Sequence, residues 1–252
     1  MPGREITVSV VSHGQNALVN ALLGDLQRHA AGRIKLLLTQ NLPDAEVLAT
    51  SDMSCPVEIL ANTHVRGFGA NHNAAFRRCD TPFFLVMNPD IRVASDFLAP
   101  LLSALADPRV AVAGPLVRSP AGRIEDSVRR FPTTAGLMKK FFVDRAAPDY
   151  PVGTDALEVD WLAGMCMLFR SDAYRALGGF DEAYFLYYED VDICRRLHAR
   201  GAAVLFEPRA EVIHDARRAS RRNPRLALHH LASMLRYLRQ NDSPPGGSGS
   251  DA

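Results

Sequence analysis

The chain has 252 residues, of which 47% are hydrophobic and 23% are charged, and its formal net charge is +1. This composition allows one large domain with a full core or two small domains, and the near-neutral charge gives no reason to expect a nucleic-acid partner. The sequence contains neither a recognisable signal peptide nor the roughly 18–20 apolar residues of a membrane span, so we expect a cytoplasmic protein.

The first half of the chain alternates apolar runs with segments of helical periodicity. The expected elements are strands over 5–12, 33–41, 57–60, 82–90 and 110–117, and helices over 15–31, 69–79 and 96–107. Continuous apolar strands that alternate with helices predict an α/β fold with a mostly parallel sheet covered on both faces. Ligands of such sheets bind beyond the carboxyl ends of the strands.

Polar side chains follow four of these strands, at the point where each strand ends. They are Ser12-His13, Asn41, Asn62 and the stretch Asn88–Asp90. Each alone is a common turn former. Because the ends of parallel strands meet at one edge of a sheet, their coincidence indicates a ligand-binding edge.

The second half is less regular. Residues 118–160 have no clear period, and we expect loops and short strands there. The later expected elements are strands over 165–169, 202–208 and 210–215, and helices over 171–179, with Ser171 as N-cap, 189–200 and 225–240. The last helix carries Leu228, Leu231, Leu235 and Leu238 on one face, and the Pro/Gly/Ser-rich tail after it should be disordered.

The four cysteines are Cys55, Cys79, Cys166 and Cys194. No two of them form a CxxC pair, and no His/Cys cluster has the spacing of a zinc site. Cys166 and Cys194 lie in apolar runs, where a free cysteine behaves as a small hydrophobe. We expect reduced thiols.

Carboxylates are embedded among aromatic residues in "FLYYEDVDICRRL". Glu189, Asp190 and Asp192 begin a predicted helix, where acids also complement the helix dipole on a solvated face. Asp190 and Asp192 cannot share a helix face, so at most one or two of the three acids point to one place. Aromatic surroundings favour a raised pKa for an acid that points inward, which suits a general base.

Asp90 and His214 each follow an apolar strand. An aspartate at such an edge can bind a divalent cation, or it can simply form a Pro-Asp turn. His214 can supply a metal with an imidazole nitrogen, but a lone histidine is more often a hydrogen-bonded structural residue. Their convergence in space is an assumption at this stage.

The stretch "NTHVRGFGANHN" places Gly67 and Gly69 between Asn62 and Asn73. Glycines let backbone N–H groups approach a phosphate or a base closely. The stretch is neither a GxGxxG fingerprint nor a P-loop, so Rossmann dinucleotide binding is poorly supported.

Together these segments resemble the inverting nucleotide-sugar glycosyltransferases of family two, which have the GT-A fold: a mostly parallel central sheet flanked by helices. The resemblance covers about residues 6–220. It is carried by "VVSHG", "NTHVRGFGANHN", "VMNPD", "WLAGMCMLFR", "GGFDEAYFLYYEDVDICRRL" and "VIHDARRAS". Within the family, the "NPD" form and the last of these stretches look like rhamnosyltransferases of bacterial surface polysaccharide synthesis.

The resemblance implies one glycosyltransferase domain over residues 1–240. Its parts would be a nucleotide-sugar-binding half over 1–115, an acceptor and catalytic half over 116–223 and a C-terminal helix over 224–240, followed by a disordered tail over 241–252.

The resemblance also implies roles for individual residues. Asp90, with His214, would bind Mg²⁺ or Mn²⁺ at the donor diphosphate, and Asp190, with its neighbour Glu189, would be catalytic. The nucleotide would be held by Ser12, Gln40, Asn41, Asn62, Arg66, Gly67, Asn73 and Asn88. The acceptor would meet Trp161, Gly164, Tyr187 and Tyr188, and the diphosphate would meet Arg217 and Arg218.

Two positions depart from the family pattern. Asn88 replaces the first aspartate of the DxD-type element, so metal binding should depend mainly on Asp90. Many relatives have an Asp-Asn pair after the second strand, whereas this chain has Thr39-Gln40-Asn41. Base recognition would then shift to Gln40 or Asn41, which leaves the choice of nucleotide open.

The implied function is metal-dependent inverting transfer of a sugar, with L-rhamnose from dTDP-L-rhamnose the first choice and a UDP-sugar the other. The acceptor would be a hydroxyl of a surface polysaccharide or a glycolipid, including a lipid-linked glycan of the cell envelope. One alternative is a catalytically degenerate nucleotide-sugar-binding protein, which Asn88 and Gln40 motivate. Another is a nucleotidyltransferase, but the N-terminal "VVSHGQNALVN" lacks the Gly/Arg/Lys-rich loop of such enzymes. The last helix either packs on the domain or docks on the inner face of the membrane.

Overall fold

The computed structural model describes residues 4–133, 149–215 and 224–241. Arg217 and Arg218 lie outside the described residues, as does the predicted tail after Asn241. Within those ranges, no helix is long and apolar enough to cross a membrane.

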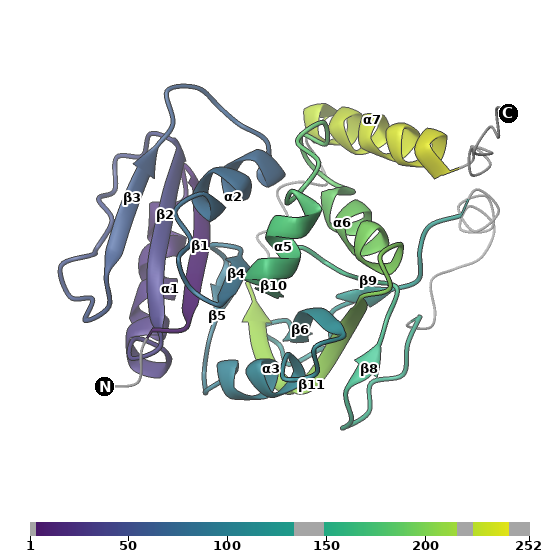
Figure 1. Ribbon diagram of the computed structural model, residues 1–252. Helices are drawn as coiled ribbons and strands as arrows, with labels where there is room; N and C mark the ends of the chain where they lie inside the picture. Colours follow the sequence, from purple (N-terminus) through teal and green to yellow (C-terminus); the bar gives the residue numbers. More distant parts are fainter. Residues whose placement is uncertain (1–3, 134–148, 216–223, 242–252) are drawn as a thin grey trace, which may run out of the picture.

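The centre of the fold is a nine-stranded sheet whose two halves differ in strand direction (Figure 1). In the first half all neighbouring strands are parallel, as the continuous apolar runs predicted. In sheet order these strands are β3 (Val57–Ala61), β2 (Ile34–Leu42), β1 (Ile6–His13) and β4 (Phe83–Met87).

The second half mixes strand directions. Strand β10 (Cys166–Arg170) runs antiparallel between β4 and β6 (Val110–Arg118), and β6 pairs in parallel with β11 (Ala203–His214). The short strands β5 (Ile91–Arg92) and β8 (Leu157–Glu158) each pair antiparallel with β11. Two further short strands, β7 (Val128–Arg129) and β9 (Trp161–Leu162), form a separate ribbon.

Helices cover both faces of the sheet. Strand β4 shows the division, because Leu85 and Met87 belong to one apolar cluster while Phe84 and Val86 belong to the other. The first cluster includes residues of α1 (Asn16–His29) and α3 (Leu98–Ala104). The second includes residues of α2 (Phe68–Phe76), α5 (Ser171–Leu177), α6 (Glu189–His198) and α7 (Pro224–Asn241).

Two local predictions were wrong. The strands expected over 202–208 and 210–215 are a single strand, β11, whose pairing with β6 is interrupted between Glu207 and Glu211. Ser171 is the first helical residue of α5, and the extended Arg170 precedes it as N-cap. The Ser171 hydroxyl instead lies 3.5 Å from the Cys79 sulfur, and the Ser171 N–H donates to the Pro82 carbonyl.

The last helix packs on the domain with a face that includes only Leu238 of its leucine stripe. Ser233 and Tyr237 are buried, whereas Leu228, Leu231 and Leu235 are 66%, 47% and 43% exposed. Figure 1 shows α7 lying across the second half of the molecule, close to α6. The expectation that the stripe packs on the domain is therefore wrong for Leu231 and Leu235, whereas Leu238 is partly buried against the second apolar cluster.

Candidate active site

Asp90 and His214 converge because the two-residue strand β5 pairs with the end of β11. The register places His214 opposite Ile91, directly after Asp90. His214 Nε2 lies 3.2 Å from Asp90 Oδ2, and His214 Nδ1 lies 2.8 Å from Glu125 Oε2. Glu125 follows strand β6, which is parallel to β11, so a loop of the aperiodic region supplies the second carboxylate.

The charges around His214 form a compact electrostatic unit. Burial lowers the pKa of His214, but hydrogen bonds and charges from Asp90 and Glu125 outweigh that effect and raise the pKa to about 8. Imidazole held between two carboxylates has a fixed ring orientation, as for histidines that ligate metals.

The residues present fit a divalent cation bound jointly with a ligand. Asp90 Oδ1 is buried and has no hydrogen-bond partner among the described residues, which leaves one hard oxygen for a cation. Within the described ranges, no three His, Cys, Asp or Glu side chains are arranged to hold a metal alone. The protein thus offers Asp90 and His214, and further ligands would have to come from a bound diphosphate and water.

A cavity of about 620 Å³ opens beside Asp90, at the carboxyl ends of β1, β2 and β4. Its predicted members are Asn41, Arg66, Asn88 and Asp90. Other lining residues were not foreseen, among them Gln15, Phe68, Phe185, Leu226 and His229. The volume and position match a cleft for a small ligand at the sheet edge that the strand ends indicated.

Asn41 shapes this cleft through bonds within the protein. Its Oδ1 accepts hydrogen bonds from the Arg66 N–H and from Asn62 Nδ2, while its Nδ2 donates to the Arg66 carbonyl. The Arg66 guanidinium and the Gln15 amide group, in contrast, line the cleft and form no hydrogen bond with other described residues. These two side chains are free to contact a ligand.

Several residues predicted to hold a nucleotide do not line the cleft. Ser12 is buried, and its hydroxyl donates to Asn16. Gln40 and Asn62 lie at the ends of β2 and β3 without reaching the lining, and Asn62 links Asn41 to Asn71. Gly67 begins α2 against the Phe185 backbone, where an added Cβ would lie 2.5 Å from the Phe185 carbonyl oxygen.

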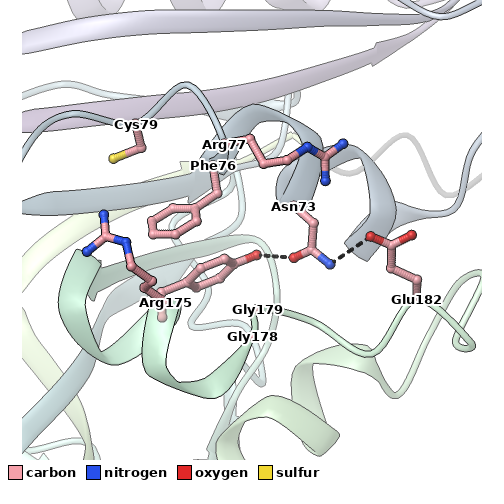
Figure 2. A pocket seen from close by; sticks show the side chains of 9 residues that line it. Asn73, Phe76, Arg77, Cys79, Arg175, Gly178, Gly179 and Glu182 are labelled. Atoms are coloured by element: carbon pink, nitrogen blue, oxygen red, sulfur yellow. Dashed lines mark hydrogen bonds between the residues drawn. The ribbon is translucent and has the colours of Figure 1, made fainter.

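Asn73 lines a different pocket, of about 360 Å³, between α2 and α5 (Figure 2). Its Oδ1 accepts from the Tyr174 hydroxyl and the Phe180 N–H, and its Nδ2 donates to the Phe180 carbonyl and to Glu182. One of these bonds ties α2 to α5 and the other three tie it to the segment after α5. This position favours a structural role for Asn73.

The acids of the "YEDVD" segment divide between two environments. Asp192 pairs with Arg196 at 2.7 Å, on the same helix. Glu189 and Asp190 lie at the start of α6, directly after Tyr187 and Tyr188, which have positive φ angles of 71° and 67°. The expectation that Asp190 and Asp192 point apart is thus confirmed.

Burial raises the pKa of both Glu189 and Asp190. Their mutual proximity adds to the rise for Glu189, whose Oε2 is buried and has no hydrogen-bond partner among the described residues. Asp190 accepts hydrogen bonds from the N–H groups of Gly164 and Val191, which partly offset the effect of burial. A carboxylate with a raised pKa that keeps a fixed orientation has the properties of a general base.

The Gly164-Met165 dipeptide joins the two sets of acids. The Gly164 N–H donates to Asp190 Oδ2 at 3.0 Å, and the Met165 carbonyl accepts from the Asn88 N–H at 2.9 Å. The ring of Phe68, which lines the cleft, approaches to 3.4 Å of the position of a Cβ on Gly164. Asp190 does not line the cleft itself, but Gly164 connects it to Phe68 of the cleft and, through Met165, to the strand end that carries Asp90.

The predicted acceptor residues lie around Asp190. Trp161 is buried and donates to the Arg130 carbonyl, and Arg129 stacks on its ring. Tyr187 and Tyr188 pack against His230 of α7, with ring centroids 5.2 and 5.5 Å apart. His230, Arg129 and Glu125 were not foreseen as part of the site. Arg129 and Glu125 lie in the aperiodic region 118–160, and His230 lies in a predicted helix whose only sequence signal is its leucine spacing.

Solved structures of low sequence identity share this fold. GalNAc-T7, with UDP, GalNAc and Mn²⁺, aligns with a TM-score of 0.66 and 14% identity over 84% of this chain and 44% of that chain. The mannosyltransferase PcManGT of Pyrobaculum calidifontis, with GDP-Man and Mn²⁺, aligns with a TM-score of 0.64 and 17% sequence identity. The alignment covers 96% of this chain and 66% of that chain. The sheet, its helices and these likenesses define a GT-A fold.

Sequence comparison then places the chain within that class. The model of the family described as Glycosyltransferase like family 2 matches residues 2–243, so the chain belongs to this family of glycosyltransferases. Rhamnosyltransferase WbbL of Escherichia coli K12 is 29% identical over 246 residues, which cover 92% of each protein. An N-acetylglucosaminyl-diphospho-decaprenol L-rhamnosyltransferase of Mycobacterium tuberculosis is 35% identical over 163 residues, 60% of this chain and about half (53%) of the relative.

Proposed function

We propose that the protein transfers L-rhamnose from dTDP-L-rhamnose to a hydroxyl of a glycan or lipid-linked glycan, with inversion at the anomeric carbon and with help from a divalent metal. Two relatives with rhamnosyltransferase names support the choice of sugar. Such a reaction would serve the synthesis of bacterial surface polysaccharide.

One observation carries the proposal: the Gly164-Met165 dipeptide is bonded both to Asp190 and to the residue two positions before Asp90. A metal-binding carboxylate and a base with a raised pKa are thus supported by the same short segment, beside a cleft of about 620 Å³. Transfer from a nucleotide diphosphate needs both functions at adjacent positions.

Asp90 and His214 would hold the metal. When bound, Mg²⁺ or Mn²⁺ would neutralise negative charge on the departing diphosphate. Glu125 would fix the His214 ring through its bond to Nδ1. The phosphate contacts would come from Arg66 of the cleft and from Arg217 and Arg218, which lie outside the described residues.

Asp190 would act as the base in a single displacement. Its carboxylate takes the proton of the acceptor hydroxyl while that oxygen forms a bond to the anomeric carbon. The bond from the anomeric carbon to the diphosphate oxygen breaks, and its electron pair leaves with the nucleotide. Attack opposite the leaving group inverts the anomeric configuration.

The acceptor side would be formed by the aromatic residues around Asp190. Trp161, Tyr187 and Tyr188 would exclude water that could otherwise hydrolyse the donor. Gly164 would let the acceptor approach, because its nearest neighbours are the Phe68 ring and the Asp190 Cβ, both 3.4–3.5 Å from the position of an added Cβ.

A lipid-linked acceptor would lie at a membrane surface, and α7 suits contact with one. The helix sequence contains arginines and no acid, and its outer face exposes Leu228, Leu231 and Leu235. We expect flotation with vesicles that contain anionic lipid, and loss of flotation in Leu231→Ser with Leu235→Ser. Absence of flotation for the unaltered protein at low salt would remove this part of the proposal.

Calorimetric binding of dTDP, UDP and GDP, each with and without Mg²⁺, tests the donor and the metal. We expect metal-dependent binding of dTDP that is lost in Asp90→Ala and retained in the matched control Asp80→Ala, an exposed aspartate paired with Lys35. Preferential binding of UDP or GDP would discard rhamnose as the sugar, and equal binding by Asp90→Ala would discard the metal assignment.

A transfer assay with dTDP-L-rhamnose and a polyprenyl-diphospho-N-acetylglucosamine acceptor tests the chemistry. Asp190→Asn should reduce kcat by at least about 10²–10⁴-fold, the usual contribution of a general base, while nucleotide binding is kept. NMR of the first-formed product should show inverted anomeric configuration. Retained configuration would refute the single displacement.

A further inference from the structure

The turn that leads into α6 has a backbone conformation that is unfavourable for the residues of the turn. Tyr187 and Tyr188 are consecutive non-glycine residues with φ angles of 71° and 67°. A side chain in this left-handed region meets its own backbone, so the conformation persists only where the surroundings impose it. Glu189 and Asp190 follow immediately, and the direction of their side chains depends on this turn.

Helix α7 contacts this turn at successive positions. The Ser233 hydroxyl donates to the Leu186 carbonyl at 2.9 Å. The His230 ring, which stays exposed to solvent, makes edge contacts with the rings of Tyr187 and Tyr188, and the Tyr237 ring centroid lies 5.5 Å from that of Tyr188.

The same helix also holds the start of the segment. Gln240 accepts a hydrogen bond of 2.7 Å from the Tyr184 hydroxyl, and Arg236 pairs with Asp181 at 3.2 Å. The packed face of α7 therefore follows the chain from Asp181 to Tyr188, which explains why polar and aromatic residues share this face with Met234 and Leu238 while Leu228, Leu231 and Leu235 are exposed.

On its other side the turn is blocked by the start of α2. The Phe68 N–H donates to the Phe185 carbonyl at 2.9 Å, and Gly67 is so close to Phe185 that a Cβ there would lie 2.5 Å from the carbonyl oxygen. The turn is thus held between two helices that are distant in sequence, and it cannot relax towards α2.

We propose that α7 holds the turn 185–188 in its left-handed conformation and thereby aims Asp190, so that Ser233 and His230 are positioning residues for sugar transfer. This inference rests on the proposed role of Asp190 as the base. Neither Ser233 nor His230 lines the donor cleft, whereas Phe185, Leu186 and His229 do. The loss of either contact should therefore reduce turnover without weakening donor binding.

The test compares Ser233→Ala, His230→Ala and His230→Phe in the full chain. The two alanine variants should lower kcat about tenfold, because misplacement of a catalytic group by a fraction of an ångström to 1 Å costs up to about 10²-fold. Their dissociation constants for dTDP should stay within about twofold, since substrate positioning and nucleotide binding are separate here. His230→Phe should have a kcat close to that of the unaltered protein, because its ring of similar size keeps the contacts with the rings of Tyr187 and Tyr188.

Ser103→Ala on α3 is the matched control. It also removes a serine hydroxyl from a helix, but Ser103 is exposed and α3 packs on the opposite face of the sheet. We expect its kcat to equal that of the unaltered protein. Amide hydrogen exchange supplies a readout besides activity: Ser233→Ala should speed exchange at Phe68 and over residues 185–192, and Ser103→Ala should not.

An unchanged kcat in both alanine variants would overturn the proposal. So would a loss of kcat that follows the loss of thermal stability and that His230→Phe does not restore, because it would reflect folding alone. Failure of the proposed function looks different: Asp190→Asn would then keep its transfer activity, whatever the α7 variants do.

Discussion

Two adjacent glycines after α5 provide a controlled test of how this segment is held against α2. Gly178 and Gly179 have φ angles of 80° and 74°, so alanine is disfavoured at both for the same backbone reason. Their surroundings differ. A Cβ on Gly178 would meet nothing within 4 Å, whereas one on Gly179 would overlap Asn73 Oδ1 and lie 2.9 Å from Tyr174 Cε1 (Figure 2).

The expected costs follow from this difference. Gly178→Ala should lower the free energy of unfolding by about 1–2 kcal/mol, the cost of one left-handed residue. Gly179→Ala adds displacement of Asn73, whose Oδ1 accepts from the Tyr174 hydroxyl and the Phe180 N–H. Leaving these two buried polar groups unpaired costs about 1–3 kcal/mol each, so with the backbone cost the total should be about 3–8 kcal/mol.

Urea denaturation followed by circular dichroism measures both values under the same conditions. The quantity of interest is the difference between the two variants, because the backbone contribution cancels in it. We expect a difference of at least about 2 kcal/mol. A difference within the roughly 0.5 kcal/mol of ordinary surface substitutions would refute the reasoning, since it would mean that Asn73 moves aside freely.

Three carboxylates give further expected outcomes. Burial raises the pKa of Asp190, the proposed base, and a base acts only when it is charged. We therefore expect kcat to fall as the pH decreases, with a midpoint above the pKa of roughly 3.9 of an ordinary aspartate. A kcat that stays constant down to about pH 4 would contradict this. Burial raises the pKa of Asp25, but hydrogen bonds from Arg92 and Val93 bring this pKa below its ordinary value. The charged Asp25 therefore stabilises the fold above about pH 4, and this contribution is lost as the pH falls through the lower pKa of the folded state. Asp25→Asn should therefore cost about 3 kcal/mol at pH 7 and progressively less in acid, as measured by urea denaturation. Glu125→Gln should raise the Mg²⁺ concentration for half-maximal transfer roughly tenfold by loosening His214, and an unchanged requirement would argue against the metal assignment.

Strands β1, β2 and β4 could be predicted from sequence because each is a largely apolar run whose residues are mostly buried, whereas the edge strand β3 is only partly buried. The polar residues at their ends also lie at one edge, and Asn41, Asn88 and Asp90 line the cleft. Which polar residue faces the cleft could not be predicted, since it depends on partners far along the chain. Asn73 illustrates this, because its amide is bonded to residues after α5.

The face that α7 packs on the domain was hidden by its own composition. Four leucines at helical spacing suggest the buried side of a helix. In the structure Leu228, Leu231 and Leu235 are exposed, and the packed side includes Ser233 and Tyr237. On this side the Ser233 hydroxyl bonds to the Leu186 carbonyl and the Tyr237 ring contacts the Tyr188 ring. The hydrophobicity of a helix face does not predict such contacts.

The direction of one strand decides whether the site can exist. Strand β10 is antiparallel to β4, so Cys166 at its start lies opposite Met87 at the end of β4. The residues just before β10, Gly164 among them, are therefore delivered to the edge that carries Asp90, and Asp190 follows through its bond to Gly164. A parallel β10 would place Gly164 at the opposite edge, level with Thr81 instead of Pro89, which is about eight residues or roughly 26 Å away at about 3.3 Å per residue. The apolar run of β10 is compatible with either direction, which is why the sequence could name both aspartates without showing that they meet.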